Sequence, residues 1–157
     1  MRKAVRTARY LDERHVRDAA IRWLGLKGYA RNRQVAGKGE HGADIRVRHN
    51  EYPRYFIVEA KGDANPRTVE NLGARREVAF LLAVGQIVTR MDTKAAYHYG
   101  LALPGSFESK VKIRLPWLFC KANDLQVLLV DSQGKVRAVN WHHLKEAQAG
   151  RSRKATR

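Results

Sequence analysis

The chain has 157 residues, of which 44% are hydrophobic and 29% charged, so it suits one domain with a real core rather than a disordered protein. Its 31 lysines and arginines against 15 acidic residues give a formal net charge of +16. Such a domain repels itself unless a polyanion neutralises it, and nucleic acid is the commonest such partner. A membrane partner is not expected, because the sequence has neither an apolar run near the roughly 20 residues of a span nor a basic amphipathic helix.

The single cysteine, Cys120, excludes an internal disulfide and a zinc site built from cysteines. The basic N-terminus is followed by no apolar segment of the kind that secretory signal peptides contain. We therefore expect a cytoplasmic protein. Its expected organisation is one domain over residues 1–149 and a basic, disordered tail over residues 150–157.

The first predicted element is a helix over residues 12–27, where apolar residues recur at the spacing of one helical face. Asp12 is a suitable N-cap for this helix, and Gly28 is a natural left-handed stop. A short strand over residues 33–35 and a glycine-rich turn over residues 37–42 are predicted to follow.

Two further strands come next in the chain. Over residues 43–48, apolar and charged side chains alternate, which is typical of a half-buried strand. Residues 55–58 are apolar on both faces, as in a central strand, and they lead into Glu59, Ala60 and Lys61.

The second half of the chain completes an α/β pattern. Residues 75–90 predict a helix that is apolar nearly all round, so we expect it to be deeply buried. A further helix is predicted to begin at a Ser106 cap and to be interrupted at Pro116. The remaining predicted elements are strands over residues 96–103, 125–131 and 136–139 and a short last helix from Trp141. The fold class is thus α/β, with a mixed central β-sheet flanked by helices.

The first candidate for chemistry is the pair Glu59 and Lys61. Because side chains two apart on a strand point to the same face, a carboxylate and an ammonium project together from the end of the most apolar strand. Charges buried there need a partner or a metal ion. The pair alone is equally compatible with a structural salt bridge.

Asp44 adds a second carboxylate to this end of the sheet. It lies on the preceding predicted strand, so a hairpin of the two strands can place its carboxylate near that of Glu59. Two carboxylates, a main-chain carbonyl and water suit a hard cation such as Mg²⁺. A lysine beside such an ion can orient a water and balance the charge of a phosphate.

The segments Gly42-Ala43-Asp44-Ile45 and Phe56-Ile57-Val58-Glu59-Ala60-Lys61-Gly62 resemble the core motif of the PD-(D/E)XK restriction-endonuclease-like nucleases. The resemblance implies a restriction-endonuclease-like core in which Asp44 and Glu59 bind Mg²⁺, for which Mn²⁺ can substitute. It also implies that the Ala60 carbonyl is a further metal ligand and that Lys61 assists the attacking water. The usual proline before the first acid is Ala43 here.

Two further positions extend the resemblance. Glu13, early in the first helix, matches an acid of many family members and is a candidate metal ligand, or else a solvated glutamate at a helix N-terminus. Gln86 matches a glutamine on the helix after the Glu-x-Lys strand in Mrr-type endonucleases and archaeal Holliday-junction resolvases, or else it is a satisfied core glutamine.

The basic residues nearest to this motif are candidates for DNA contacts. Arg90 lies one turn after Gln86 on the same helical face and is placed to meet a phosphate. The other candidates are Arg46, Arg48 and Arg75. His98, His142 and His143 lack the partners of a zinc site and are not assigned to one.

The resemblance and the charge together lead to the hypothesis of a magnesium-dependent endodeoxyribonuclease that acts on duplex or branched DNA. Both restriction-type cutting and junction resolution need two coordinated cuts, so a two-fold homodimer is expected, and the sequence does not choose between the two roles. The alternatives are a non-catalytic DNA-binding module on the same fold and a subunit that depends on a partner protein.

Overall fold

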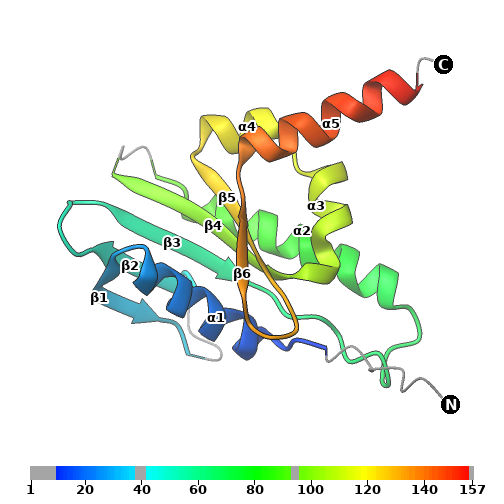
Figure 1. Ribbon diagram of the computed structural model, residues 1–157. Coiled ribbons are helices and arrows are strands. Elements are labelled where there is room, and N and C mark those ends of the chain that lie inside the picture. Colours follow the sequence, from blue (N-terminus) through cyan, green and yellow to red (C-terminus); the bar gives the residue numbers. More distant parts are fainter. Residues whose placement is uncertain (1–9, 38–41, 93–95, 156–157) are drawn as a thin grey trace, which may run out of the picture.

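The computed structural model describes residues 10–37, 42–92 and 96–155 (Figure 1). The elements in chain order are α1 (Glu13–Leu26), β1 (Tyr29–Val35), β2 (Ile45–His49), β3 (Tyr55–Ala60), α2 (Leu72–Arg90), β4 (Tyr97–Pro104), the 3₁₀ turn η1 (Gly105–Phe107), α3 (Glu108–Arg114), α4 (Trp117–Ala122), β5 (Leu125–Val130), β6 (Val136–Val139) and α5 (Trp141–Ala155). Among these helices none is long and apolar enough to cross a bilayer.

The strands form one six-stranded sheet whose spatial order, β1 to β6, is the order of the chain. β1, β2 and β3 pair antiparallel, and β6 pairs antiparallel with β5. β3, β4 and β5 are parallel, so helices must connect them across a face of the sheet. The predicted fold class is confirmed: the protein is α/β, with a mixed central sheet and flanking helices.

The helices cover the two faces of the sheet unequally (Figure 1). On one face, α1 packs its buried residues against the apolar side of β2 and β3, which includes Val47 and Val58. On the other face, α2 to α5 share a core with β3, β4 and β5 around Leu101 and Val127. The predicted boundaries of α1 are confirmed, because Asp12 accepts a hydrogen bond from the His15 N–H at 2.9 Å and Gly28 has φ +86°.

The expected deep burial of α2 is wrong. Only Phe80, Ala83 and Ile87 of this helix are buried. The exposed fractions of its other large apolar side chains are 55% for Val78, 50% for Leu81, 54% for Leu82 and 45% for Val88. A helix that lies on one sheet contacts it along a single side, so apolar residues around the whole circumference leave an apolar strip in water.

Other local predictions need correction. Ser106 does not cap a helix: its hydroxyl donates to Asp63 Oδ2 at 2.8 Å, and α3 starts without a side-chain cap. β1 is longer than the predicted strand over residues 33–35, because its pairing with β2 already begins at Tyr29. Residues 150–155, assigned above to a disordered tail, continue α5 as helical backbone. Residues 38–41 of the predicted glycine-rich turn lie outside the described residues.

Candidate active site

The predicted hairpin brings Asp44 to the end of β3. Ile45 is the first residue of β2 and pairs with Val58 near the end of β3. Asp44, one residue before Ile45, therefore lies beside the last residues of β3. Its Oδ2 accepts a hydrogen bond from the Ala60 N–H at 2.7 Å. The Asp44 carboxylate therefore takes the place of a backbone carbonyl in the ladder, which fixes it beside the strand that carries Glu59.

Glu59 is the charged residue at the centre of the site, and only 1% of its surface is exposed. Burial, together with the negative charge of the Asp44 carboxylate, raises the pKa of Glu59 from 4.5 to about 7, although a hydrogen bond from Arg90 opposes this shift. The Asp44 carboxylate is thus close enough to Glu59 to disfavour ionisation of Glu59. At neutral pH such a pair holds a proton for part of the time or needs a cation.

Arg90 closes the site from the C-terminal end of α2. Its Nε donates to Glu59 Oε1 at 3.2 Å, and its Nη2 donates to the Gly42 carbonyl at 2.8 Å. The arginine thereby joins α2 to Glu59 and to the residues that precede Asp44. In this structure its guanidinium is directed to protein groups rather than to a position that would meet a phosphate.

Lys61 comes directly after the end of β3 and reaches the start of α1. Its Nζ lies 3.8 Å from Glu13 Oε2, and the side chains of Lys61 and Glu13 are 17% and 48% exposed. Close packing holds the two elements together: a Cβ on Gly62 would lie 2.2 Å from the Glu13 backbone nitrogen. The Asp63 N–H also donates to the Leu11 carbonyl at 2.7 Å.

Glu13 therefore pairs with Lys61 and does not join the two carboxylates of Asp44 and Glu59. Over the described ranges, no group of three or more His, Cys, Asp or Glu side chains is placed to hold a metal ion. The oxygen ligands that the chain offers to a metal ion are the carboxylates of Asp44 and Glu59 and a main-chain carbonyl near them. The sequence predicts that this carbonyl is that of Ala60.

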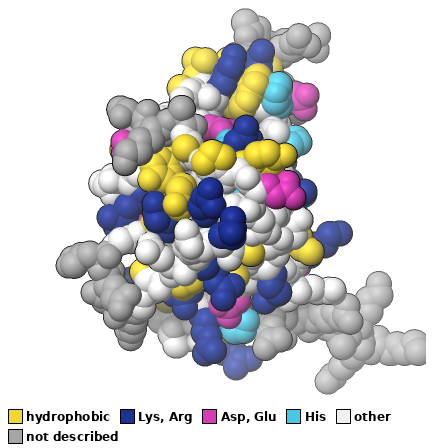
Figure 2. All heavy atoms as spheres, turned by 90° about the vertical axis from the view of Figure 1, so that its left-hand side faces the viewer, with side chains coloured by type: hydrophobic (Ala, Val, Ile, Leu, Met, Phe, Trp, Pro, Cys, Tyr) yellow, Lys and Arg dark blue, Asp and Glu magenta, His cyan; other side chains and the backbone are white. Residues whose placement is uncertain are grey.

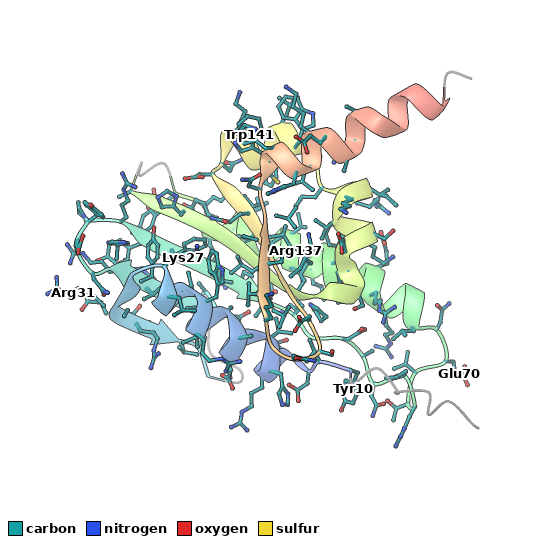
Figure 3. The ribbon with its side chains drawn as sticks, viewed as in Figure 1. Tyr10, Lys27, Arg31, Glu70, Arg137 and Trp141 are labelled. Carbon is teal, nitrogen blue, oxygen red and sulfur yellow. The ribbon has the colours of Figure 1, made fainter. Side chains whose placement is uncertain are left out.

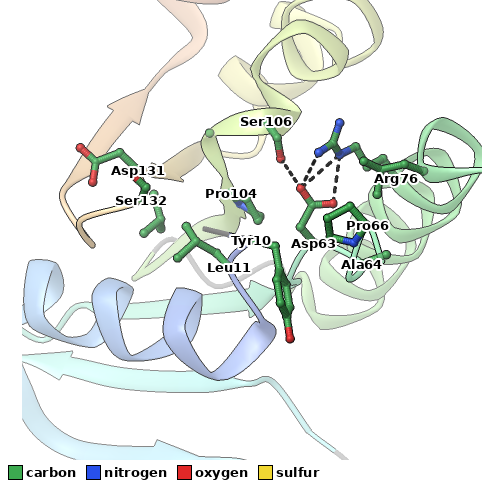
Figure 4. Close-up of a pocket in the computed structure, with 13 residues that line it drawn as sticks. Tyr10, Leu11, Asp63, Ala64, Pro66, Arg76, Pro104, Ser106, Asp131 and Ser132 are labelled. Carbon is green, nitrogen blue, oxygen red and sulfur yellow. Dashed lines mark hydrogen bonds and ion pairs between the residues drawn. The ribbon is translucent and has the colours of Figure 1, made fainter. Parts of the chain in front are cut away.

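Asp63, which no sequence pattern singled out, organises the loop that follows the motif (Figure 4). Arg76 on α2 binds it with both Nε and Nη2, the shorter contact being 2.7 Å, and Ser106 binds it from η1. Burial raises the pKa of Asp63, but the hydrogen bonds from Arg76 and Ser106 outweigh this and hold the pKa below its usual range. No local sequence signal marks these contacts, because each one joins distant elements.

Gln86 lies on the outward half of α2, among the residues that line a shallow groove with Leu82 and Gly85. Its Oε1 is buried and has no hydrogen-bond partner within the described part of the chain. The reading of Gln86 as a satisfied core glutamine is therefore wrong. A buried amide oxygen without a donor is costly.

A basic and aromatic surface adjoins the acidic pair. Asp44, Arg46 and Arg48 share one face of β2, because Ile45 and Val47 between them are buried on the α1 side. The Arg46 guanidinium lies 4.2 Å from the ring centre of Tyr55 and donates to the Tyr97 hydroxyl at 3.4 Å. This stacking holds the cation flat against the sheet, beside the strand that carries Glu59.

Positive charge extends from this surface to the outer edge of the sheet. Residues 30–35 of β1 are exposed, and Arg31 projects outward there (Figure 3). Viewed from that side, Lys and Arg side chains are spread over the molecule, with few acidic side chains between them (Figure 2). Arg75, at the start of α2, lines the same 340 Å³ cavity as Glu13 and Lys61. The acidic pair thus lies within a largely positive surface.

No protein-family model and no curated protein matches the sequence. Among solved structures, the fold is similar to that of an XisH family protein from Nostoc punctiforme PCC 73102, with a TM-score of 0.48 and 14% identical residues over 80% of this chain and 99% of that one. A likeness of this strength says nothing about activity or about a branch of the nucleases. The protein is thus an α/β domain in which two carboxylates and an arginine meet at the carboxyl end of β3.

Proposed function

We propose that this protein is a magnesium-dependent endodeoxyribonuclease that hydrolyses phosphodiester bonds of duplex or branched DNA. The observation that carries the proposal is the convergence of the Asp44 and Glu59 carboxylates at the end of β3, with a basic surface alongside. Lys61 follows directly after this strand. A structural salt bridge explains Glu59 and Arg90, but it does not explain why a second carboxylate is held against a fully buried one.

The donor set fits a hard divalent cation. The Asp44 carboxylate raises the pKa of Glu59 even though Arg90 lowers it, so the positive charge of one arginine does not fully offset the two carboxylates. A divalent cation bound between the carboxylates would offset the remaining negative charge. Asp44, Glu59 and the Ala60 carbonyl would supply the oxygen ligands that Mg²⁺ prefers and Mn²⁺ accepts. Such an ion lowers the pKa of water and stabilises negative charge on phosphate oxygens.

The side chains around the pair suit the remaining tasks of hydrolysis. Lys61 is mostly buried and pairs with Glu13, and in the proposed reaction its ammonium would donate to the attacking water and to an oxygen of the scissile phosphate. Arg46, Arg48 and Arg75 would bind phosphates on either side, which would fix the register of the DNA without reading its sequence.

The test is cleavage of supercoiled plasmid and of a synthetic four-way junction by purified protein, with Mg²⁺, Mn²⁺ or EDTA. Cleavage with either metal and none with EDTA is expected. Asp44→Asn, Glu59→Gln and Lys61→Ala should each lower the rate by at least about 100-fold. Glu146→Gln, which changes an exposed carboxylate on α5, is the matched control and should cut at the wild-type rate.

Metal binding has a readout of its own. Mg²⁺ at about 100 times its Kd should stabilise the wild-type fold by roughly 2.7 kcal/mol, visible as a rise in Tm, and the rise should vanish in Asp44→Asn. A protein that binds DNA equally well with EDTA, shows no Mg²⁺-dependent Tm shift and never cuts would be the non-catalytic binding module. Cutting that appears only after a co-purifying protein is added would identify a partner-dependent subunit.

A further inference from the structure

Two helices that carry aromatic and basic residues meet at the edge of the sheet opposite the acidic pair. α4 ends just before β5 begins, and α5 follows β6, whose last residue Val139 pairs with Val127 near the start of β5. Glu59 lies at the carboxyl end of β3, and β3, β4 and β5 run parallel, so α4 and the start of α5 lie at the other edge of the sheet. Figure 3 shows Trp141 at this end of the molecule and Tyr10, which precedes α1, at the far end.

Three aromatic side chains, Trp117, Trp141 and His142, form a stack here that we term the ring column. The ring centres of Trp117 and Trp141 are 6.1 Å apart and their planes are inclined by 30°, and the His142 ring lies on Trp141 at 3.4 Å and 26°. The two tryptophans are half-buried, whereas His142 is exposed. Nucleobases stack on aromatic side chains in this way, because every base has a flat π-face. The ring column therefore reaches solvent at His142, where a further flat ring can join it.

Two lysines lie beside the ring column. Lys121 Nζ is 4.9 Å from the ring centre of Trp141, and Lys145 Nζ is 5.1 Å from that of Trp117. Both lysine residues are exposed, so each ammonium can bind a phosphate while its stem stays close to the ring. Aromatic faces and ammonium groups side by side are the two kinds of group that single-stranded nucleic acid requires.

The charge of the two helices is complementary to a polyanion. The sequences of α4 and α5 contain one acidic residue, Glu146, against five basic ones. Besides the two lysines at the rings, the basic residues are Arg151, Arg153 and Lys154 on the last turns of α5. At 1.5 Å per residue, this second group begins about 15 Å along the helix from Trp141. The positive charge would attract a polyanion, and the rings would select one whose bases are exposed.

We propose that the ring column and its two lysines bind single-stranded nucleic acid, with bases stacked on the rings and phosphates bound by the lysines. In a duplex the flat faces of the bases are covered by neighbouring base pairs, so a duplex would meet the lysines alone. The six residues of β5, about 20 Å of strand, separate this end of the sheet from the end at which the acidic pair lies. The ring column is therefore a site of its own, and binding there does not depend on the proposed function.

An anionic membrane is the rival partner for tryptophans flanked by lysines. Such binding requires an apolar face that enters the lipid. Of the two leucines on these helices, Leu118 is 62% exposed and Leu144 is fully buried. One exposed leucine is too small an apolar surface to hold a protein on a bilayer, whereas stacking on bases needs only ring faces. The side chains present thus favour a single strand over a membrane.

The tryptophans themselves report binding at this site. The chain has three of them, so Trp23→Phe leaves only those of the ring column. In EDTA, an oligothymidylate of about 15 nucleotides should quench the fluorescence of Trp23→Phe, because bases stack on the indole rings. A duplex of the same length should need an at least about 10-fold higher concentration for the same quenching. Absence of quenching by the single strand, equal quenching by the duplex, or quenching by phosphatidylserine vesicles alone would overturn the proposal.

Substitutions of exposed side chains, made in the Trp23→Phe protein, locate the strand without disturbing the core. His142→Ala should weaken binding at least about 5-fold, as expected for the loss of one stacked base, and His142→Phe, which keeps a ring, should retain it. Lys121→Ala should reduce the slope of log K against log salt concentration by about 0.7, the contribution of one phosphate of a single strand. Lys135→Ala removes an exposed lysine between β5 and β6 and should bind like its parent. A folded His142→Ala protein that binds with unchanged affinity would also overturn the proposal.

Cleavage and quenching separate this site from the proposed function. A protein that binds the single strand at the ring column but never cuts DNA would refute only the nuclease. A protein that cuts plasmid with Mg²⁺, while its tryptophan fluorescence does not respond to the single strand, would refute only the ring column as a binding site.

Discussion

At the level of single residues, the site is defined by a shortage of positive charge. Glu59 is buried beside a second acid, and one arginine faces the pair. Because burial and the Asp44 carboxylate both raise the pKa of Glu59, small changes in the surrounding charges shift the protonation of Glu59.

Glu59 should destabilise the metal-free protein as the pH rises. Its pKa is raised from 4.5 to about 7, so the folded state binds a proton that the unfolded chain releases, and stability falls across this window and levels off above it. Glu59→Gln cannot ionise and escapes the loss. In EDTA, its free energy of unfolding relative to the wild type should increase by on the order of 2 kcal/mol between about pH 4.5 and pH 8. Urea titrations measure this, and a pH-independent difference would contradict it.

Arg90 should also affect the pKa of Glu59. Its hydrogen bond and charge lower the pKa of Glu59, so Arg90→Gln should raise that pKa above about 7. The pH at which the cleavage rate of Arg90→Gln begins to rise should then be higher than for the wild type. In alkaline buffer the variant should regain cleavage activity. Arg137→Ala, which removes an exposed cation on β6, is the control and should leave the profile in place. An unshifted profile in Arg90→Gln would show that Arg90 does not act through Glu59.

At the level of elements, the junction between α1 and β3 is tightly packed. A Cβ on Gly62 would lie 2.2 Å from the Glu13 nitrogen and 2.5 Å from the Asp12 carbonyl carbon, both of them backbone atoms. Gly62→Ala must therefore separate α1 from the strand end, and we expect a loss of at least about 1–3 kcal/mol in stability. Gly73→Ala on α2, whose Cβ would be 3.6 Å from the nearest atom, is the matched control. Equal melting temperatures of the two variants would contradict this packing.

The sequence predicted those elements that depend on neighbouring residues. The hairpin that carries Asp44 and Glu59 could be predicted, because its two strands are consecutive and each has a clear apolar pattern. The contacts of Arg90 with Gly42 and of Ser106 with Asp63 were not, because they join residues more than 40 positions apart. The burial of α2 was misjudged for a related reason: composition shows that a helix is apolar but not how many of its sides are covered.

At the level of the whole molecule, Lys and Arg side chains are spread over the face that Figure 2 shows. DNA affinity should therefore depend steeply on salt. The double variant Arg46→Ala and Arg48→Ala should reduce the slope of log K against log salt concentration by about 1.8, since each phosphate contact contributes about 0.9. Fluorescence anisotropy with a labelled duplex measures this. An Arg137→Ala protein should retain the wild-type slope, and an unchanged slope in the double variant would place the DNA elsewhere.

The order of the strands, which repeats the order of the chain, has a consequence for synthesis on the ribosome. Each strand emerges next to the one it must join, so the sheet can grow by addition at one border. A nascent chain that has reached the end of β3 already contains both acids, whereas the arginine that offsets them arrives only with the end of α2, thirty-one residues after Glu59. The first half of the domain must therefore assemble around two unshielded anions, and free divalent cations or mild acidity should speed that early step.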